Sequence, residues 1–394
     1  MKTYLKIVPN DWKNASRDKR ELSVANELGY QVKIIAKGER NDKYKKDLVD
    51  GFVVYRFSTR PLKLPELFNP LNRIITAFQW GYYVRSFNAD IISCHDLIAL
   101  LIGYMSTLFI SLSQKPILIY DSHEFEIARN TKRNKIHKFF IKKLEGFLIH
   151  KTSLNIMVND TIAEEVQRIY GLVKKPLVIR NIPNYWTLDE NEIIKCRNDM
   201  MSHLNITESG LIIMYHGLIC KGNGIDLAVK ALGNTKDVGL VILGYTHTPE
   251  YIDFLKELIN EYELSDRCYF HDAVSINELY KYVGAADIGM LTFEAITRSY
   301  YYTLPNKFFE NIQALTPMIC SDFPELNKLI QKYEIGYLCD PNDEKQIANY
   351  INLMQNDKRI CNRFKENLLI AKKELNWENE KIALLTALND IKKG

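Results

Sequence analysis

The sequence has no paired cysteines. Its seven cysteines are odd in number, lie scattered over 394 residues and form no Cys-x-x-Cys or Cys-x-x-His spacing. This pattern argues against a disulfide framework and against a cysteine-based metal site. We therefore expect reduced cysteines in the core of a cytoplasmic protein. They are Cys94, Cys196, Cys220, Cys268, Cys320, Cys339 and Cys361.

The chain also has little net charge. It carries 52 Lys and Arg against 48 Asp and Glu, a formal net charge of +4. A general nucleic-acid binder has a much larger basic excess, so we expect no nucleic-acid partner and look only for local basic patches.

Long hydrophobic runs, repeats and low-complexity tracts are absent as well. Residues 97–113 carry no charge but include Gly103 and Ser106, and they are at the lower limit for a membrane span. Because they lie between two strand-like runs, we favour a buried crossover helix. Residues 1–3 lead directly into a short strand-like run, so we expect no signal peptide.

Strand-like and helix-like segments alternate along the whole chain, which is typical of an α/β protein with parallel sheets. The length fits two domains. The strand-like runs are 4–8, 31–36, 52–57, 90–94, 116–120, 154–158, 176–180, 211–215, 238–243, 267–270, 287–291 and 317–320. We expect two Rossmann-like domains facing across a cleft, with ligands at the carboxyl ends of the strands.

The domain boundary is expected near residue 186. Residues 181–184 and the polar stretch 187–200 have the composition of a linker. The first domain would comprise 1–186 together with a C-terminal helix, 374–394, and the second domain would comprise 187–373.

The most informative segment is 304–315, a helix-like stretch that leads into a strand. Pro305 suits the first position of a helix, where free amides and the helix dipole favour an anion. Lys307 would add a positive charge, and Glu310, one turn later, could accept hydrogen bonds from two vicinal ribose hydroxyls. The alternative is an amphipathic helix with a solvated Lys–Glu pair.

Several other strand ends carry chemistry suited to a nucleotide. Gly217 ends one strand, and Gly222 and Gly224 lie in the following turn, where they would let the backbone approach a phosphate. Gly244 and His271 end two further strands, although such a histidine is often an ordinary surface residue.

Taken together, these segments resemble the GT-B glycosyltransferases, family 4 in particular. The resemblance covers nearly the whole chain, including the last helix, which in this fold crosses back onto the first domain. Its landmarks are 16–32, 89–97, 120–124, 178–184, 215–217, 241–244, 285–291, 304–310 and 317–325.

The resemblance implies that a sugar is transferred from a nucleotide-sugar donor to a hydroxyl with retention of configuration. It implies no metal and no cofactor apart from the donor itself. Glu310 would hold the donor ribose, Asn306 and Lys307 would lie near the sugar and diphosphate, and His271 would lie near the base. His123 matches an acceptor-domain histidine that reaches the donor sugar, although it could instead be structural.

Three departures from the family pattern bear on the donor site. Leu218 and Asn223 stand where the family has cations for the diphosphate, and Tyr302 replaces an acidic residue. Lost cations of this kind need substitutes, for which Lys221, Arg298 and Lys307 are candidates. The predicted catalytic residues are His123, Lys307 and Glu310, and the donor-binding residues are Gly217, Lys221, Asn223, Gly244, His271, Arg298, Leu304 and Asn306.

The acceptor side is expected in the first domain. Asp11, Arg17, His95 and Asp96 follow strands and could contact the acceptor, or their side chains could cap helices. Residues 129–144 combine basic and apolar positions without an acidic residue. Such a helix suits an anionic membrane surface, but it could equally pack on its own domain.

The sequence therefore predicts a glycosyltransferase that builds a bacterial-type surface polysaccharide on a glycan or lipid-linked acceptor. We expect it in the cytoplasm, with peripheral binding to the inner face of the cell membrane. Two alternatives stay open: an inactive homologue that acts as a sugar-nucleotide-binding partner subunit, and a sugar-nucleotide epimerase on the same fold. The nucleotide, the sugar and the linkage are not determined by the sequence.

Overall fold

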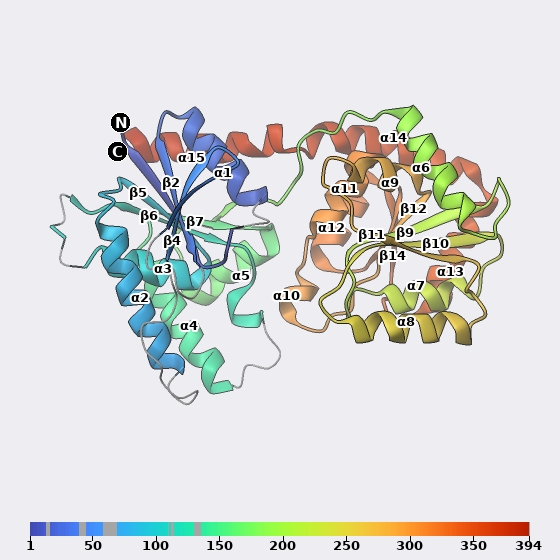
Figure 1. The fold of residues 1–394 in the computed structure, drawn as a ribbon, viewed down its shortest axis with the longest axis horizontal. Helices are drawn as coiled ribbons and strands as arrows, with labels where there is room; N and C mark the ends of the chain where they lie inside the picture. Colours follow the sequence, from blue (N-terminus) through green and yellow to red (C-terminus); the bar gives the residue numbers. More distant parts are fainter. Residues whose placement is uncertain are drawn as a thin grey trace. The chain divides into compact units, whose positions relative to one another are not determined.

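The structure of the protein is a computed structural model, which describes residues 1–12, 16–38, 45–57, 69–108, 110–111, 114–129 and 135–393. The chain divides into two compact units. Unit 1 comprises residues 1–180 and 381–394, and unit 2 comprises residues 181–380. Each unit is a sheet covered by helices (Figure 1).

Unit 1 contains an eight-stranded sheet with the order β3-β4-β2-β1-β5-β6-β7-β8. All its pairings are parallel except that of β3 with β4. The strands are β1 (Thr3–Val8), β2 (Gln31–Lys37), β3 (Lys45–Val49), β4 (Phe52–Phe57), β5 (Ile91–His95), β6 (Ile117–Ser122), β7 (Leu154–Met157) and β8 (Leu177–Val178).

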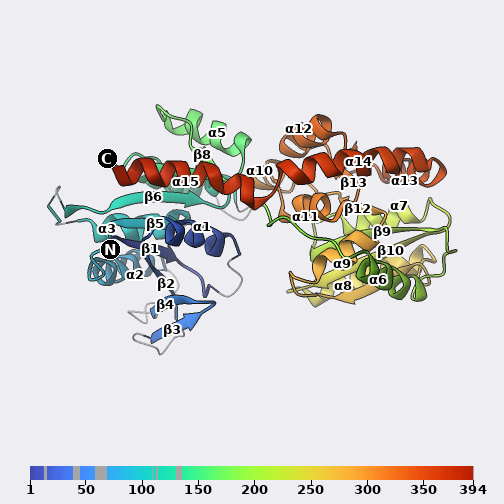
Figure 2. The same cartoon turned by 90° about the horizontal axis from the view of Figure 1, so that it is seen from above.

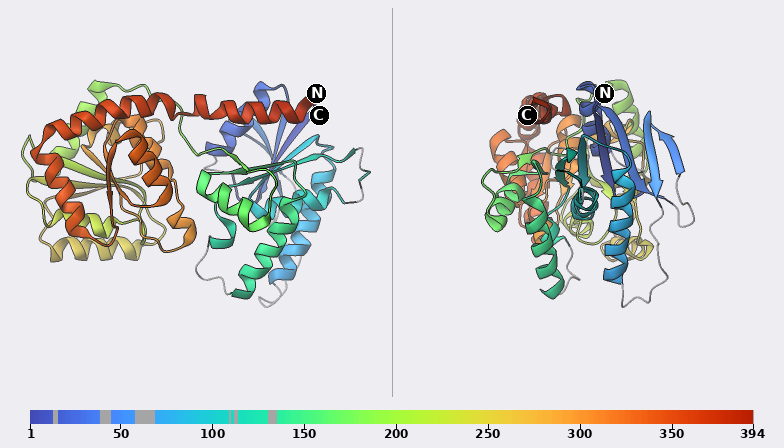
Figure 3. Two further views of the ribbon diagram at one scale, coloured as in Figure 1. Left: turned by 180° about the vertical axis from the view of Figure 1, so that it is seen from behind. Right: turned by 90° about the vertical axis from the view of Figure 1, so that its left-hand side faces the viewer.

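Helices cover both faces of this sheet. α1 (Ser16–Glu27) and the last helix, α15 (Trp377–Lys393), lie over one face (Figure 2). The opposite face carries α2 (Asn69–Arg85), α3 (Asp96–Ser106), α4 (Lys135–Ile149) and α5 (Asp160–Tyr170), which are seen below the strands in Figures 1 and 3. A short 3-10 turn, η3 (Glu126–Ala128), precedes α4. Because both faces are covered, strands such as β1 are buried along their length, and the residues of β1 are apolar except Thr3 and Lys6.

Unit 2 contains a six-stranded, entirely parallel sheet with the order β11-β10-β9-β12-β13-β14. The strands are β9 (Leu211–Leu218), β10 (Val238–Tyr245), β11 (Cys268–Asp272), β12 (Ile288–Leu291), β13 (Met318–Ser321) and β14 (Gly336–Cys339). The strand order reverses at β9, since β10 lies on one side of it and β12 on the other. Ligands of doubly wound sheets bind at the carboxyl ends of the strands beside such a reversal.

The helices of unit 2 form two layers around its sheet (Figure 1). One layer consists of α7 (Ile225–Leu232), α8 (Pro249–Glu261) and α13 (Glu344–Asn356), whose apolar residues share a core with β9 and β10. The other layer includes α6 (Glu190–Ser202), α9 (Leu279–Ala285), α11 (Asn306–Ala314) and α12 (Pro324–Tyr333). The remaining helices are α10 (Arg298–Tyr301) and α14 (Lys358–Glu374).

The predicted α/β fold class with two Rossmann-like domains is confirmed, and all twelve predicted strands are present. Two strands, β3 and β14, were not predicted. The linker interpretation of 187–200 is wrong for most of that stretch, because α6 is a helix whose Met200 is buried. The predicted crossover helix in 97–113 is α3, which ends at Ser106, and residues 109, 112 and 113 lie outside the described residues. Among the described helices, none is long and apolar enough to span a membrane.

Candidate functional site

The amino end of α11 lies at the point where the strand order of unit 2 reverses. The residues that gather there from β9, from the segment after β12 and from α11 are Tyr215, His216, Gly217, Phe293, Lys307 and Glu310, which we call the α11 site. Pro305 is the residue before the helix, one position earlier than predicted, and its extended backbone directs the chain into the first turn. Free amides of that turn favour an anion.

Lys307 places a buried ammonium group in this site. Its side chain as a whole is partly exposed, but Nζ is buried and has no hydrogen-bond partner among the described residues. Nζ lies 4.0 Å from the ring centroid of Tyr215 and 5.0 Å from that of Phe293. Burial lowers the pKa of Lys307 to about 7, although the Glu310 carboxylate acts in the opposite direction. An unpaired buried amine of this kind is suited to an anionic ligand.

Glu310 lies one turn along α11 from Lys307 and contacts β9. The Nε2 atom of His216 lies 2.9 Å from Oε2 of Glu310. The His216 residue is only 3% exposed, and the Glu310 side chain is 12% exposed. Glu310 therefore keeps acceptor capacity on both oxygens while one of them is held by the histidine.

Glycines shape the turns around the α11 site. Gly217 has φ 115°, a backbone conformation that favours glycine, and its ideal Cβ position is 3.5 Å from Cε of Lys307. Gly224, which precedes α7, would place a Cβ 1.9 Å from the carbonyl oxygen of Thr292. Gly244 lies beside Gly217 in the register of β10 and β9.

Asn223 occupies the interior of the turn after β9. Its Nδ2 donates to the carbonyl oxygen of Leu218 at 2.8 Å and to the hydroxyl of Tyr215 at 3.0 Å. Asn223 was predicted to bind the donor. Its side-chain amide bridges parts of this turn, and the residue is only 7% exposed.

The other predicted donor-binding residues are more peripheral. Lys221, Asn306 and Arg298 are exposed, and Arg298 begins the short helix α10. Leu304 packs against the apolar core beneath α11. His271 is partly buried in β11, where its Nδ1 lies 2.6 Å from the carbonyl oxygen of Asp272 and its ring centroid lies 4.7 Å from that of Tyr282.

Unit 1 contains a second concentration of charge, at the carboxyl ends of β1, β5 and β6. Lys6, in the middle of β1, is completely buried. Its Nζ contacts the carboxylates of Glu21, Asp121 at 3.0 Å and Asp18 at 3.3 Å. Burial opposes its charge, but the three carboxylates outweigh that effect and raise the pKa of Lys6. We call Lys6, Arg17, Asp18, Glu21, His95, Asp121 and His123 the Lys6 cluster.

Two histidine rings of the Lys6 cluster lie in contact, with their planes tilted by 36°. The ring centroids of His95 and His123 are 3.6 Å apart. His95 Nδ1 lies 3.1 Å from both oxygens of Asp18, and His123 Nε2 lies 2.9 Å from Oδ2 of Asp121. Although burial disfavours its charge, the hydrogen bond and charge of Asp18 raise the pKa of His95.

The remaining predicted acceptor-side residues are Arg17, Asp96 and Asp11, and they have different surroundings. Arg17 belongs to the Lys6 cluster, because it donates to Asp121 at 2.7 Å and to the carbonyl oxygen of Ile179 at 2.5 Å. Asp96 has φ 64° and accepts from the amide of His123 at 2.9 Å, so its side chain does not cap α3. Asp11 is exposed, and its carbonyl oxygen accepts from Arg56.

Asp18, His95 and His123 also place one potential ligand atom each within 4.8 Å of one another. This spacing can hold a metal ion. The ammonium of Lys6 already neutralises Asp18 from 3.3 Å, and a bound cation would face it directly. We therefore assign no metal to this group.

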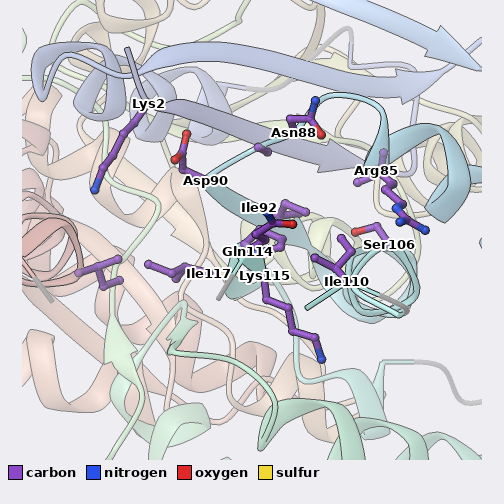
Figure 4. Close-up of a pocket in the computed structure, with 14 residues that line it drawn as sticks. Lys2, Arg85, Asn88, Asp90, Ile92, Ser106, Ile110, Gln114, Lys115 and Ile117 are labelled. Carbon is purple, nitrogen blue, oxygen red and sulfur yellow. The ribbon is translucent and has the colours of Figure 1, made fainter. Parts of the chain in front are cut away.

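A pocket of about 660 Å³ lies elsewhere in unit 1, at the amino ends of the strands (Figure 4). Lys2, Arg85 and Lys115 line it, but their charged ends point in different directions. None of the predicted site residues is among its lining residues. The carboxylate of Asp90, which lines the pocket, accepts a hydrogen bond from the backbone amide of Thr3 at 2.6 Å. The pocket therefore does not gather charge around one ligand position.

Comparison with known families identifies the chain. Residues 197–369 match the family model of the glycosyl transferases group 1, and residues 23–184 match the model of glycosyltransferase family 4. Each match falls almost entirely within one of the two units. The chain is a family 4-like GT-B glycosyltransferase.

Solved structures share the fold of this glycosyltransferase over almost its full length. Sucrose-phosphate synthase from Thermosynechococcus elongatus superimposes with a TM-score of 0.78 at 16% identity, covering 99% of each chain. HepE from Anabaena, solved in complex with UDP-glucose, superimposes with a TM-score of 0.76 at 14% identity, covering 100% of both chains. WaaG, a glycosyltransferase involved in lipopolysaccharide biosynthesis, superimposes with a TM-score of 0.68 at 12% identity, covering 96% of this chain and 99% of WaaG. No curated protein matches the glycosyltransferase in sequence.

The sequence interpretation missed some members of both sites. The contact of His216 with Glu310 and the rings around Lys307 were not predicted, although Tyr215-His216-Gly217 was recognised as a strand end. Lys6 was also missed. The available signal was a single lysine in the middle of a largely apolar strand, because a charge that is buried there needs a partner.

Proposed function

We propose that this glycosyltransferase transfers a sugar from a nucleoside diphosphate sugar to a hydroxyl group with retention of anomeric configuration. The observation that carries the proposal is the buried, unpaired ammonium of Lys307 at the amino end of α11, one turn from Glu310. Together they offer a cation for a diphosphate and a carboxylate for a ribose.

The proposed reaction needs no protein nucleophile. The bond between the anomeric carbon and the β-phosphate oxygen breaks as the bond to the acceptor oxygen forms on the same face of the sugar. The departing phosphate oxygen takes the acceptor proton. Lys307 and the amides of α11 stabilise the negative charge that develops on the diphosphate, which is the charge that the family's missing cations would otherwise stabilise. We propose that no metal is required.

We propose a uridine nucleotide as the first donor to test. The support comes from HepE, a protein of the same fold that was solved in complex with UDP and with UDP-glucose. WaaG, which is involved in lipopolysaccharide biosynthesis, supports a role in surface polysaccharide synthesis. A lipid-linked glycan is the acceptor class that we propose on this basis.

We propose that the Lys6 cluster organises the acceptor side of the reaction. His123 is its catalytic candidate, because it is partly exposed while Asp121 holds its Nε2. Arg17, His95 and Asp96 fix the surrounding backbone and carboxylates. Asp11 is exposed and follows β1, and this position is the support for a place on the acceptor side.

Membrane binding through α4 is a further part of the proposal. Ile136, Phe139 and Phe140 are 68%, 56% and 64% exposed on this helix, beside several lysines. Helix α2 adds Phe78 and Tyr82, which are 52% and 77% exposed. Exposed aromatic residues combined with basic ones suit the headgroup region of an anionic bilayer. Residues 130–134 of the predicted basic stretch lie outside the described residues.

A donor-turnover assay tests the proposed function. Purified protein is incubated with labelled UDP-glucose and other common nucleotide sugars, with and without EDTA and lipid-linked acceptors. Release of the nucleoside diphosphate with transfer of label, unaffected by EDTA, is the expected result, and Glu310→Ala abolishes it. Tight nucleotide binding without turnover of any donor would support the inactive-partner alternative, and isomerised sugar without transfer would support an epimerase.

A further inference from the structure

His216 lies on the face of β9 that looks toward α11. The burial of β9 alternates between two cores: Ile213 and Tyr215 belong to the core beneath α7, whereas Met214 belongs to the core beneath α9. Because side chains alternate along a strand, His216 falls on the same face as Met214. That face carries α11, so the strand directs this imidazole at Glu310.

The contact between the two side chains has a defined polarity. A carboxylate only accepts hydrogen bonds, so Nε2 of His216 carries the proton and donates to Oε2 of Glu310 across 2.9 Å. Within the described residues, this is the side-chain hydrogen bond that the Glu310 carboxylate makes. It joins two residues that lie 94 positions apart in the sequence.

The carboxylate would otherwise have rotational freedom. Glutamate has three side-chain torsions, and fixing them on ligand binding costs conformational entropy. A buried partner on a rigid strand fixes them in advance, as outer partners do for ligating groups in other sites. Oε1 and the second lone pair of Oε2 stay available for two neighbouring hydroxyl groups.

We infer that His216 is a positioning residue that presents Glu310 to the 2′ and 3′ hydroxyls of a ribose, and thereby makes the site selective for ribonucleotides over 2′-deoxyribonucleotides. The inference rests on the proposed function, since it assumes that the α11 site binds a nucleoside diphosphate. It adds that the selectivity for ribose depends on the imidazole of His216, which does not itself touch the sugar.

The test compares paired ligands by isothermal titration calorimetry. UDP is titrated against 2′-deoxy-UDP, and GDP and ADP against their 2′-deoxy forms, on the full chain and its variants. The wild type is expected to bind the ribose form of its nucleotide on the order of tenfold more tightly than the deoxy form. In His216→Leu the affinity for the ribose form falls to that for the deoxy form, whereas the affinity for the deoxy form is unchanged.

Two further variants complete the test. His216→Gln keeps an N–H donor and is expected to restore part of the selectivity. In Glu310→Gln the selectivity is lost, and adding His216→Leu to it causes no further loss. Circular dichroism and the melting temperature confirm that each variant is folded.

The outcomes separate this inference from the proposed function. Equal losses for both ligand forms in His216→Leu would overturn the inference, because a structural residue or a phosphate contact weakens them alike. Retained selectivity in that variant would overturn it as well. A wild type that binds none of the three nucleoside diphosphates would instead overturn the proposed function.

Discussion

The ammonium of Lys307 lies 4.0 Å from the ring centroid of Tyr215 and, within the described residues, has no hydrogen-bond partner. A ring face attracts a cation but does not replace a hydrogen-bonding anion. Burial accordingly lowers the pKa of Lys307 to about 7. Near neutral pH the site therefore holds a lysine that is ready to take up a proton when an anion arrives.

Replacing Lys307 should stabilise the ligand-free protein, most strongly under acidic conditions. The pKa of Lys307 is about 7 in the folded state and 10.5 as the ordinary value, so the unfolded chain binds more protons over this interval. The free-energy cost of burying the charged lysine in the folded protein is complete below pH 7, and it disappears as the pH rises toward 10.5. Lys307→Met should raise the melting temperature more at pH 6 than at pH 9. The exposed Lys256→Met on α8 is the control, and an equal gain at both pH values would contradict the assigned pKa.

Replacing Lys6 should have the opposite effect. Lys6→Met keeps the length of the side chain but leaves Asp18, Glu21 and Asp121 buried with one fewer cation. Breaking a buried ion pair in this way costs about 3–5 kcal/mol. Chemical denaturation should show a markedly lower midpoint than for the wild type or for the exposed control Lys37→Met, also on unit 1. A midpoint equal to that of the control would show that the cluster does not need this charge.

Glu145 provides a test of pH dependence in unit 1. Its carboxyl group is buried and accepts from the hydroxyls of Tyr120 at 2.8 Å and Tyr170 at 2.7 Å. Burial raises the pKa of Glu145 to about 7, so the folded protein loses stability as the pH rises from about 4.5 to about 7. Glu145→Gln should therefore stabilise the protein more at pH 8 than at pH 5. The exposed Glu366→Gln should show no such difference, and the same flat response in Glu145→Gln would refute the assignment.

The exposed aromatic residues of α4 should govern membrane binding. The double variant Phe139→Ser and Phe140→Ser removes two exposed rings, and burial of such rings in a bilayer contributes roughly 1.5–3 kcal/mol each. Flotation with vesicles containing anionic lipid should recover the wild type and at least tenfold less of the variant. Binding of the wild type should fall with added salt. Phe254→Ser on α8 is the matched control, since Phe254 is 44% exposed on unit 2. If both variants float like the wild type, α4 is not the membrane contact.

Much of the fold could be predicted because buried parallel strands are apolar runs. β1 and β9 are uninterrupted enough to be recognised in the sequence, and the glycines and prolines around them mark their ends. β3 was not predicted because Lys45–Val49 is a polar strand at the edge of the sheet, and among the described strands it pairs with β4 alone. α6 was taken for a linker because its polar sequence hides the few positions that pack on α9.

The sites were predictable only where their chemistry is local in sequence. Lys307 and Glu310 lie one turn apart on a single helix, so their shared face follows from helical spacing. The partner of Glu310 is 94 residues away, and Lys6 and Asp121 are 115 residues apart. Such pairs are created by the strand order of each sheet, which spacing alone does not reveal.

The central claim is that Lys307 and the amino end of α11 bind the diphosphate of the donor. Calorimetric titration of UDP at pH 8, in two buffers of different ionisation enthalpy, tests it most directly. With a free pKa of about 7, only about a tenth of Lys307 is protonated at pH 8. Binding to the wild type should therefore take up nearly one proton, whereas Lys307→Met should bind about 10- to 100-fold more weakly and take up none. Unchanged affinity and unchanged proton uptake in Lys307→Met would contradict the claim.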